Sequence, residues 1–148
     1  MAEINREILI DAPLEEIFAY IIKPSNLLEI WPSLMQIKEE KSLPNGGYSF
    51  NWTYKMSGMY LEGTGKQTDI YQNQWIITET KGAIDSKMTW TFRSYEKQTR
   101  VTFTVQYRVP LPLINRLAEK IVTKMNEQEA ELILVNLRAR FMEPYISR

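Results

Sequence analysis

The chain has 148 residues, with 18 basic and 18 acidic side chains and neither cysteine nor histidine. The missing cysteine excludes a disulfide framework and a thiolate nucleophile, and the missing histidine excludes a Ser-His-Asp hydrolase or a histidine-ligated zinc enzyme. The balanced charge argues against a nucleic-acid partner held by phosphate contacts, and the length predicts a single domain over residues 1–148.

Targeting signals are not evident. The N-terminus has no basic stretch followed by an apolar run, and no apolar run reaches the length of a membrane span. We therefore expect a cytoplasmic protein without integral membrane association. Charge is uneven along the chain, since residues 1–40 carry eight acidic and three basic side chains. We interpret this as surface charge and leave a protein partner for the acidic region open.

The first three predicted elements are a strand and two short helices. Residues 3–10 alternate apolar and polar side chains and predict a strand. Residues 14–22 have the three-and-four spacing of a helix, and a second short helix is predicted between Pro24 and Pro32.

From residue 34 onward the apolar period becomes two, which predicts six further strands. Turn residues such as those at 44–47 and 57–58 separate them. The predicted strands cover residues 34–41, 48–56, 59–71, 75–80, 87–93 and 101–109. One side of these strands is aromatic and aliphatic and the other is rich in threonine, which is typical of an antiparallel sheet with one covered face.

A long helix over residues 113–142 is the last predicted element and would be about 45 Å long. Its apolar residues in steps of three and four are expected to cover the sheet: Ile114, Leu117, Ala118, Ile121, Met125, Leu132, Val135 and Ala139. Gln128 falls where this stripe predicts an apolar residue, so we expect it to find a buried partner or a ligand. The order of elements predicts an α+β fold in which a curled sheet grips the helix.

The order of several short motifs resembles the SRPBCC superfamily, also called START-like, and its polyketide cyclase/dehydrase and lipid-transport group. The stretches that carry the resemblance are 10–13, 15–18, 24–26, 52–56 before Gly58, 63–65, 90–92, 99–102 and 107–110. The resemblance implies a helix-grip fold, in which a seven-stranded curved antiparallel sheet wraps around a long C-terminal helix and encloses a hydrophobic cavity. Oxygenase members hold iron with two histidines and a carboxylate, so a chain without histidine cannot be one of them.

Large apolar side chains from the predicted inner face form the candidate ligand site. Tryptophan and tyrosine add polar tips that could orient a ligand, and methionine adds adaptable walls. The candidate residues are Phe50, Trp52, Tyr54, Leu61, Met88, Trp90, Phe103, Tyr107, Ile121, Met125 and Gln128. Gly63 and Gly65 leave one strand face bare, for close approach of the helix, a bend in the sheet or a ligand.

Three functions follow from these observations. The first is binding or carriage of a hydrophobic small molecule or lipid, with no cofactor and no metal. The second is a metal-free enzyme of cyclase, aromatase or dehydrase type, for which no motif assigns a catalytic residue and Tyr54, Tyr107 or an acid would move protons. The third is binding of a protein partner through an exposed face, as in the superfamily's chaperone activators; a filled cavity would favour it. The ligand and the oligomeric state are not predicted.

Overall fold

The computed structural model describes residues 2–108 and 116–142, with side chains in the second range from residue 123 onward. Its elements are β1 (Ala2–Ile10), α1 (Leu14–Ile21), the 3₁₀ helix η1 (Pro24–Glu29), β2 (Leu34–Ser42), β3 (Tyr48–Met56), β4 (Met59–Tyr71), β5 (Trp75–Gly82), β6 (Ser86–Tyr95), β7 (Gln98–Tyr107) and α2 (Arg116–Arg140). Within these residues seven strands form one antiparallel sheet in the order β1-β7-β6-β5-β4-β3-β2. The predicted α+β architecture, with two short helices after the first strand and a long final helix, is confirmed.

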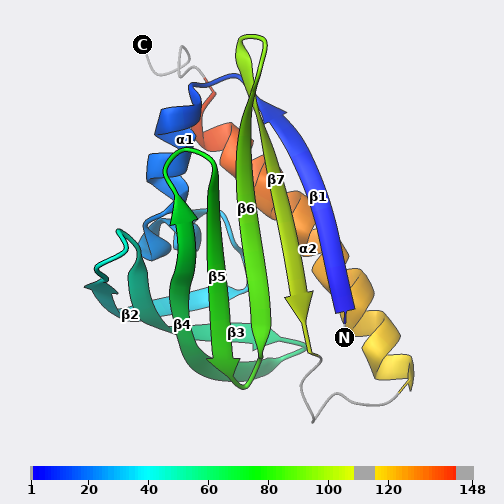
Figure 1. The fold of residues 1–148 in the computed structure, drawn as a ribbon. Coiled ribbons are helices and arrows are strands. Elements are labelled where there is room, and N and C mark those ends of the chain that lie inside the picture. The colour runs from blue at the N-terminus through cyan, green and yellow to red at the C-terminus, as the bar shows by residue number, and fades with distance from the viewer. Residues whose placement is uncertain (1, 109–115, 143–148) are drawn as a thin grey trace, which may run out of the picture.

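The sheet curls around α2 (Figure 1). In this view β1, β6 and β7 lie lengthwise in front of the helix, whereas β2 and β3 lie across the molecule. Register shifts between Lys38 and Lys41 in β2, and between Gln67 and Asp69 in β4, interrupt the pairing on this side of the sheet. Such bulges bend a strand and increase its twist, so they help to turn β2 and β3 across the end of the sheet.

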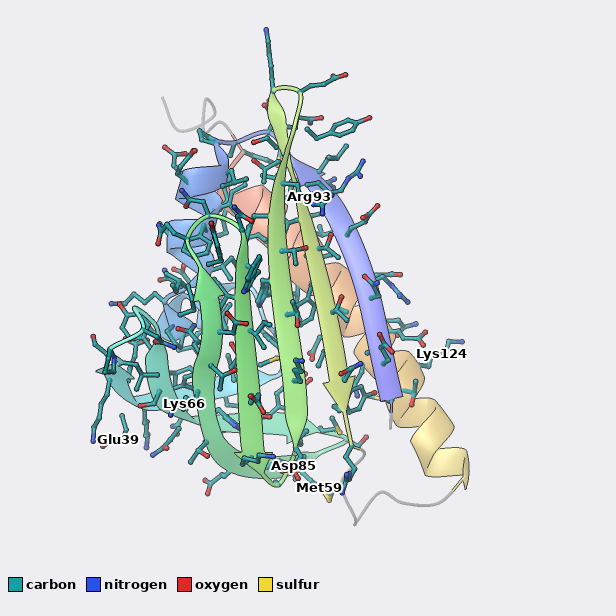
Figure 2. The ribbon with its side chains drawn as sticks, in the orientation of Figure 1. Glu39, Met59, Lys66, Asp85, Arg93 and Lys124 are labelled. Carbon is teal, nitrogen blue, oxygen red and sulfur yellow. The ribbon has the colours of Figure 1, made fainter. Side chains whose placement is uncertain are left out.

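The two faces of the sheet differ as the alternation predicts. In β7, Val101, Phe103 and Tyr107 are buried. The outer face, turned to the viewer in Figure 2, carries exposed charged side chains such as those of Lys66 and Arg93. Burial on the inner face therefore fixes the register of each strand, because a slip of one residue would exchange the two faces.

The core face of α2 differs from the prediction. The buried residues are Ala130, Ile133, Leu134 and Leu137, which follow helical spacing. The predicted stripe is wrong over this part of the helix, because Met125, Leu132, Val135 and Ala139 are exposed. Gln128 is exposed as well, so its predicted inward position is also wrong. The helix has apolar residues on two faces, and periodicity alone cannot tell which of them meets the sheet.

The boundaries of elements differ from the predictions by a few residues. The helix predicted over residues 113–142 ends at Arg140, and residues 113–115 lie outside the described part of the chain. The last strand begins at Gln98 rather than at residue 101. No helix among the described residues is long and apolar enough to cross a membrane.

The interior has two parts. The larger one joins α1, the C-terminal half of α2 and strands β1, β6 and β7 through fully buried side chains such as Ile17, Phe18 and Leu137. The smaller one is a cluster of β3 and β4 side chains made of Phe50, Trp52, Met56 and Leu61. The candidate site lies in the space between the two parts.

Candidate functional site

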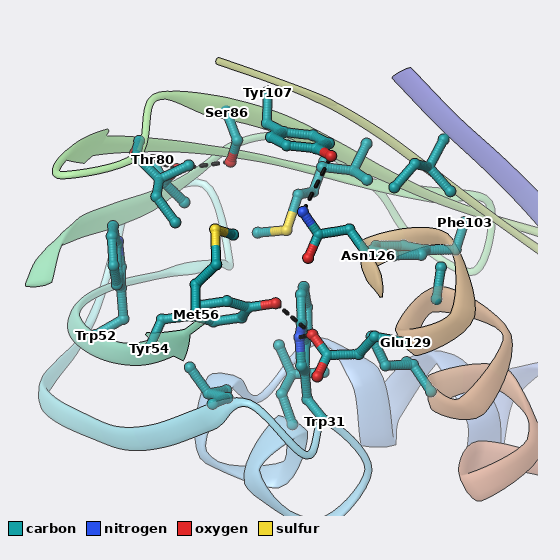
Figure 3. A pocket seen from close by; sticks show the side chains of 18 of the residues that line it. Trp31, Trp52, Tyr54, Met56, Thr80, Ser86, Phe103, Tyr107, Asn126 and Glu129 are labelled. Carbon is teal, nitrogen blue, oxygen red and sulfur yellow. Dashed lines mark hydrogen bonds between the residues drawn. The ribbon is translucent and has the colours of Figure 1, made fainter. Parts of the chain in front are cut away.

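A cavity of about 110 Å³ lies between the curled part of the sheet and α2 (Figure 3). One water molecule needs roughly 10–15 Å³ of such a cavity, so there is room for a small ligand or several waters. Six of the predicted site residues line it, namely Phe50, Trp52, Tyr54, Met88, Phe103 and Tyr107. A concave, mostly apolar space with a few polar groups is the usual form of a small-molecule site.

Two glycines in β4 shape the wall beside β3. The register pairs Trp52 with Gly63 and Phe50 with Gly65. A Cβ at Gly63 would overlap the Trp52 ring, and one at Gly65 would overlap the Phe50 ring. The bare strand face therefore makes room for the aromatic rings of the neighbouring strand, rather than for α2, and these rings form one wall of the cavity.

Glu129 of α2 is a half-buried carboxylate in the cavity wall, and four donors satisfy it. Nε1 of Trp31 donates to it at 3.0 Å, and the backbone N–H of Ser33 donates at 3.0 Å. The hydroxyls of Ser33 and Tyr54 donate as well. A carboxylate has about four acceptor positions, so Glu129 has no position free for a ligand.

The environment of Tyr54 keeps its hydroxyl protonated. Burial, followed by the nearby charge of Glu129 and the hydrogen bond to it, raises the pKa of Tyr54 far above its ordinary value near 10. The hydroxyl therefore acts as a fixed donor to Glu129 at neutral pH. Among the described residues that line the cavity, Glu129 carries the only formal charge.

The other polar groups in the wall also bond to one another. The Asn126 side-chain amide donates to the Tyr107 hydroxyl at 3.0 Å, and the hydroxyls of Thr80 and Ser86 lie 2.6 Å apart (Figure 3). Within the described residues, no buried side-chain nitrogen or oxygen lacks a partner. The wall thus combines an apolar surface with polar groups that are already satisfied.

A second hollow of about 80 Å³ adjoins the cavity on the side of the β3–β4 turn. Its wall includes the exposed residues Lys55, Ser57 and Met125. It shares Tyr54, Met56, Asn126 and Glu129 with the cavity. We call this second space the entrance hollow, because the shared side chains separate the cavity from the surface there.

The remaining predicted site residues lie elsewhere. Leu61 is buried in the β3–β4 cluster, and Trp90 is buried against Phe103 at a ring-centroid distance of 4.4 Å, so neither lines the cavity. Met125 is exposed at the entrance hollow, and Gln128 is exposed away from the cavity. The side chain of Ile121 lies outside the described residues.

Sequence reasoning missed the polar end of the site. Glu129 and Asn126 project to the cavity from the face of α2 that carries Ala130 and Ile133, a face that the prediction did not choose. Trp31 and Ser33 follow η1 and meet Glu129 from more than ninety residues away in the chain. The sequence could have indicated this polar end, because Asn126 and Glu129 lie beside the apolar residues Ala130 and Ile133 at helical spacing.

The family model described as "Polyketide cyclase / dehydrase and lipid transport" matches residues 1–142. The chain belongs to this family. The resemblance to this group is therefore confirmed. No curated protein matches the chain.

Solved structures show the same fold at low sequence identity. The protein TTHA0849 from Thermus thermophilus superposes with a TM-score of 0.82 at 19% identity, over 95% of this chain and 97% of that one. A START superfamily protein from Mycobacterium smegmatis gives a TM-score of 0.77 at 12% identity, over 94% and 96%. The Zhui aromatase/cyclase from a Streptomyces species gives 0.72 at 12% identity, over 97% of both chains. At these identities the likeness concerns the fold.

Proposed function

We propose that this member of the family binds and carries a neutral hydrophobic small molecule in the cavity between the sheet and α2. The observation that carries the proposal is a mostly apolar cavity whose polar side chains are already hydrogen-bonded to neighbouring protein groups. Burial of an apolar ligand there would contribute roughly 25 cal/mol per Å² of area removed from water.

The charge of Glu129 favours a neutral ligand over an anionic one. Glu129 is the one acidic side chain among the described residues of the cavity lining, which include no lysine or arginine. A fatty-acid carboxylate inside the cavity would meet a like charge at low dielectric, which is costly. The Tyr107 hydroxyl and the Asn126 amide are the polar groups suited to orient a carbonyl or hydroxyl oxygen.

Native mass spectrometry of freshly purified protein, followed by solvent extraction, tests the binding function. We expect a co-purifying apolar molecule, and we expect Ala130→Leu to lose it because Ala130 is buried in the cavity wall. Ala19→Leu is the matched control, since Ala19 is exposed on α1. Retention of the molecule by the Ala130→Leu variant would place it outside the cavity and contradict the proposal.

A matched pair of ligands tests the charge preference. A fatty alcohol should bind more tightly than the fatty acid of equal chain length at pH 7. Glu129→Gln should narrow this difference in affinity. Equal binding of the alcohol and the acid by the unchanged protein would refute the preference for neutral ligands, while leaving the binding function itself standing.

A cyclase- or dehydrase-type enzyme is the second candidate function, because the Tyr54–Glu129 pair puts a hydroxyl and a carboxylate in the cavity wall. The same pair is poorly suited to proton transfer, because four donors satisfy the carboxylate and the pKa of Tyr54 is raised. Turnover of a polyketide chain that disappears in Tyr54→Phe, with binding intact, would establish the enzyme. The third function, binding of a protein partner in place of a ligand, loses its main support because the cavity has free volume.

A further inference from the structure

The face of α2 opposite the core carries exposed apolar residues at helical spacing. Met125, Leu132 and Val135 are 46%, 46% and 45% exposed, and Met142 just beyond the helix is 67% exposed. Exposed Gln128 and Ala139 fill the remaining positions at this spacing. We call the six residues Met125, Gln128, Leu132, Val135, Ala139 and Met142 the outer stripe.

The outer stripe is not a scatter of single surface residues. It holds four of the nine large hydrophobic side chains that are exposed within the described part of the chain. Isolated exposed apolar residues are normal on soluble proteins, but several gathered on one face are a mark of an interaction surface.

The spacing of the outer stripe is that of helix pairing. Its residues are separated by three, four, three, four and three positions, a repeat of seven that keeps one face turned to a partner helix. The core face of the same helix uses other residues, such as Ala130, Ile133 and Leu137. The helix therefore has one apolar face packed on its own sheet and a second face with the geometry to pack on another helix.

Charges beside the outer stripe indicate a second copy of this chain, with its helix antiparallel. If Leu132 lies opposite Val135 of the second copy, Glu131 comes beside Arg138 of that copy, and two-fold symmetry repeats the pair. Glu131 is largely exposed, although it also contacts Arg6 at 3.3 Å. Arg138 has no ion pair with any described residue.

The rest of the outer stripe fits the same antiparallel register. Met125 comes opposite Met142 and Gln128 comes opposite Ala139, so a large residue meets a large one and a small residue meets a medium one. A parallel register would instead place Glu131 beside Asn136 and offer it no cation. Lys124, which extends outward from α2 in Figure 2, lies on the same flank as Glu131.

We propose that two copies of this chain form a symmetric dimer through the outer stripes of antiparallel α2 helices, with the two-fold axis midway between Ile133 and Leu134. The contact spans residues 125–142, and the helical part of it, up to Arg140, is about 24 Å long. One helix pair is a small interface, so the dimer is expected to be weak and to depend on protein concentration.

Sedimentation velocity over a range of concentrations is the first test. We expect a monomer–dimer equilibrium, and we expect Leu132→Glu or Val135→Glu to weaken it by roughly tenfold or more, since each variant places a carboxylate in the centre of the contact. Met35→Glu is the matched control, because Met35 is 39% exposed on β2, outside the stripe. Thermal unfolding checks that every variant is folded.

A charge swap tests the register through the same measurement. Arg138→Glu places glutamates opposite each other and should weaken the dimer, whereas Glu131→Arg combined with Arg138→Glu should restore it. Failure of the double swap to recover the affinity would overturn the proposed register.

Cysteine cross-linking tests the helix direction independently, because the natural chain has no cysteine. In the antiparallel dimer Gln128→Cys lies beside Ala139→Cys of the second copy, and the two copies of residue 128 are about 16 Å apart. A mixture of the two variants should form a disulfide-linked dimer, and Gln128→Cys alone should not. Self-linking of Gln128→Cys would contradict the antiparallel arrangement, and a monomer at every concentration would overturn the dimer and leave the stripe to another partner, such as a lipid surface.

Discussion

The space between the sheet and α2 is filled at one end and hollow at the other. At the filled end Ile17, Phe18 and Leu137 are at most 1% exposed, and α1 and η1 supply side chains that close the packing. At the hollow end the sheet curls away, and the rings of Phe50 and Trp52 lie over glycines instead of meeting α2. The difference indicates that the filled end stabilises the fold while the hollow end is free to hold a ligand.

The largest effect is expected at the filled end. Phe18→Ala should lower the free energy of unfolding by about 3–5 kcal/mol, because it leaves a cavity beside Phe92, whose ring lies 5.4 Å away. Denaturant unfolding measures this loss. A loss below about 1 kcal/mol would mean that this end is not the stabilising part of the core.

At the hollow end, the hydrogen bonds between Glu129 and its donors should also stabilise the fold. Glu129→Ala removes the acceptor for Trp31, Ser33 and Tyr54 and should lower the free energy of unfolding by about 2–4 kcal/mol, since partly buried donors lose their partners. Glu129→Gln keeps an acceptor oxygen and is the control, with a smaller expected loss. Equal losses for both variants would show that the charge, rather than the hydrogen bonds, matters.

A matched pair in β7 compares the two ends directly. Val101 is fully buried at the filled end, whereas Val105 is partly buried and lines the cavity. Val101→Ala should cost about 2 kcal/mol of unfolding free energy and Val105→Ala about 1 kcal/mol or less, because the second change removes atoms that already border a hollow. Equal costs in denaturant unfolding would count against the distinction between the ends.

The last expected effect depends on pH. The pKa of Tyr54 is raised in the folded state above its unfolded value near 10. The buried, protonated hydroxyl therefore contributes fully to the free energy of unfolding below pH 10, and this contribution is lost as the pH rises above 10. Above pH 10, Tyr54 should lower the free energy of unfolding by about 1.4 kcal/mol per pH unit. Tyr54→Phe should remove this pH dependence, and urea unfolding at pH 9 to 11 measures the difference between the two proteins. If the free energy of unfolding falls equally with pH in both proteins, the burial of the Tyr54 hydroxyl is contradicted.

Local patterns were sufficient to predict the architecture but only part of the site. Alternation in the strands fixed which residues face inward, so Phe50, Tyr54 and Tyr107 were placed correctly. The core face of α2 was missed because Leu132 and Leu134 belong to different apolar faces of one helix, and only packing against the sheet distinguishes them. Contacts between distant parts of the chain, such as Trp31 with Glu129, leave no periodic signal.

The most direct test of the account is native mass spectrometry of the freshly purified protein beside its Ala130→Leu and Ala19→Leu variants. The account predicts an added mass from a neutral apolar molecule in the unchanged protein and in Ala19→Leu, and its absence from Ala130→Leu. An apo mass for all three proteins, with no binding to a panel of neutral lipids and aromatic polyketides, would contradict the claim that the hollow end is a ligand site.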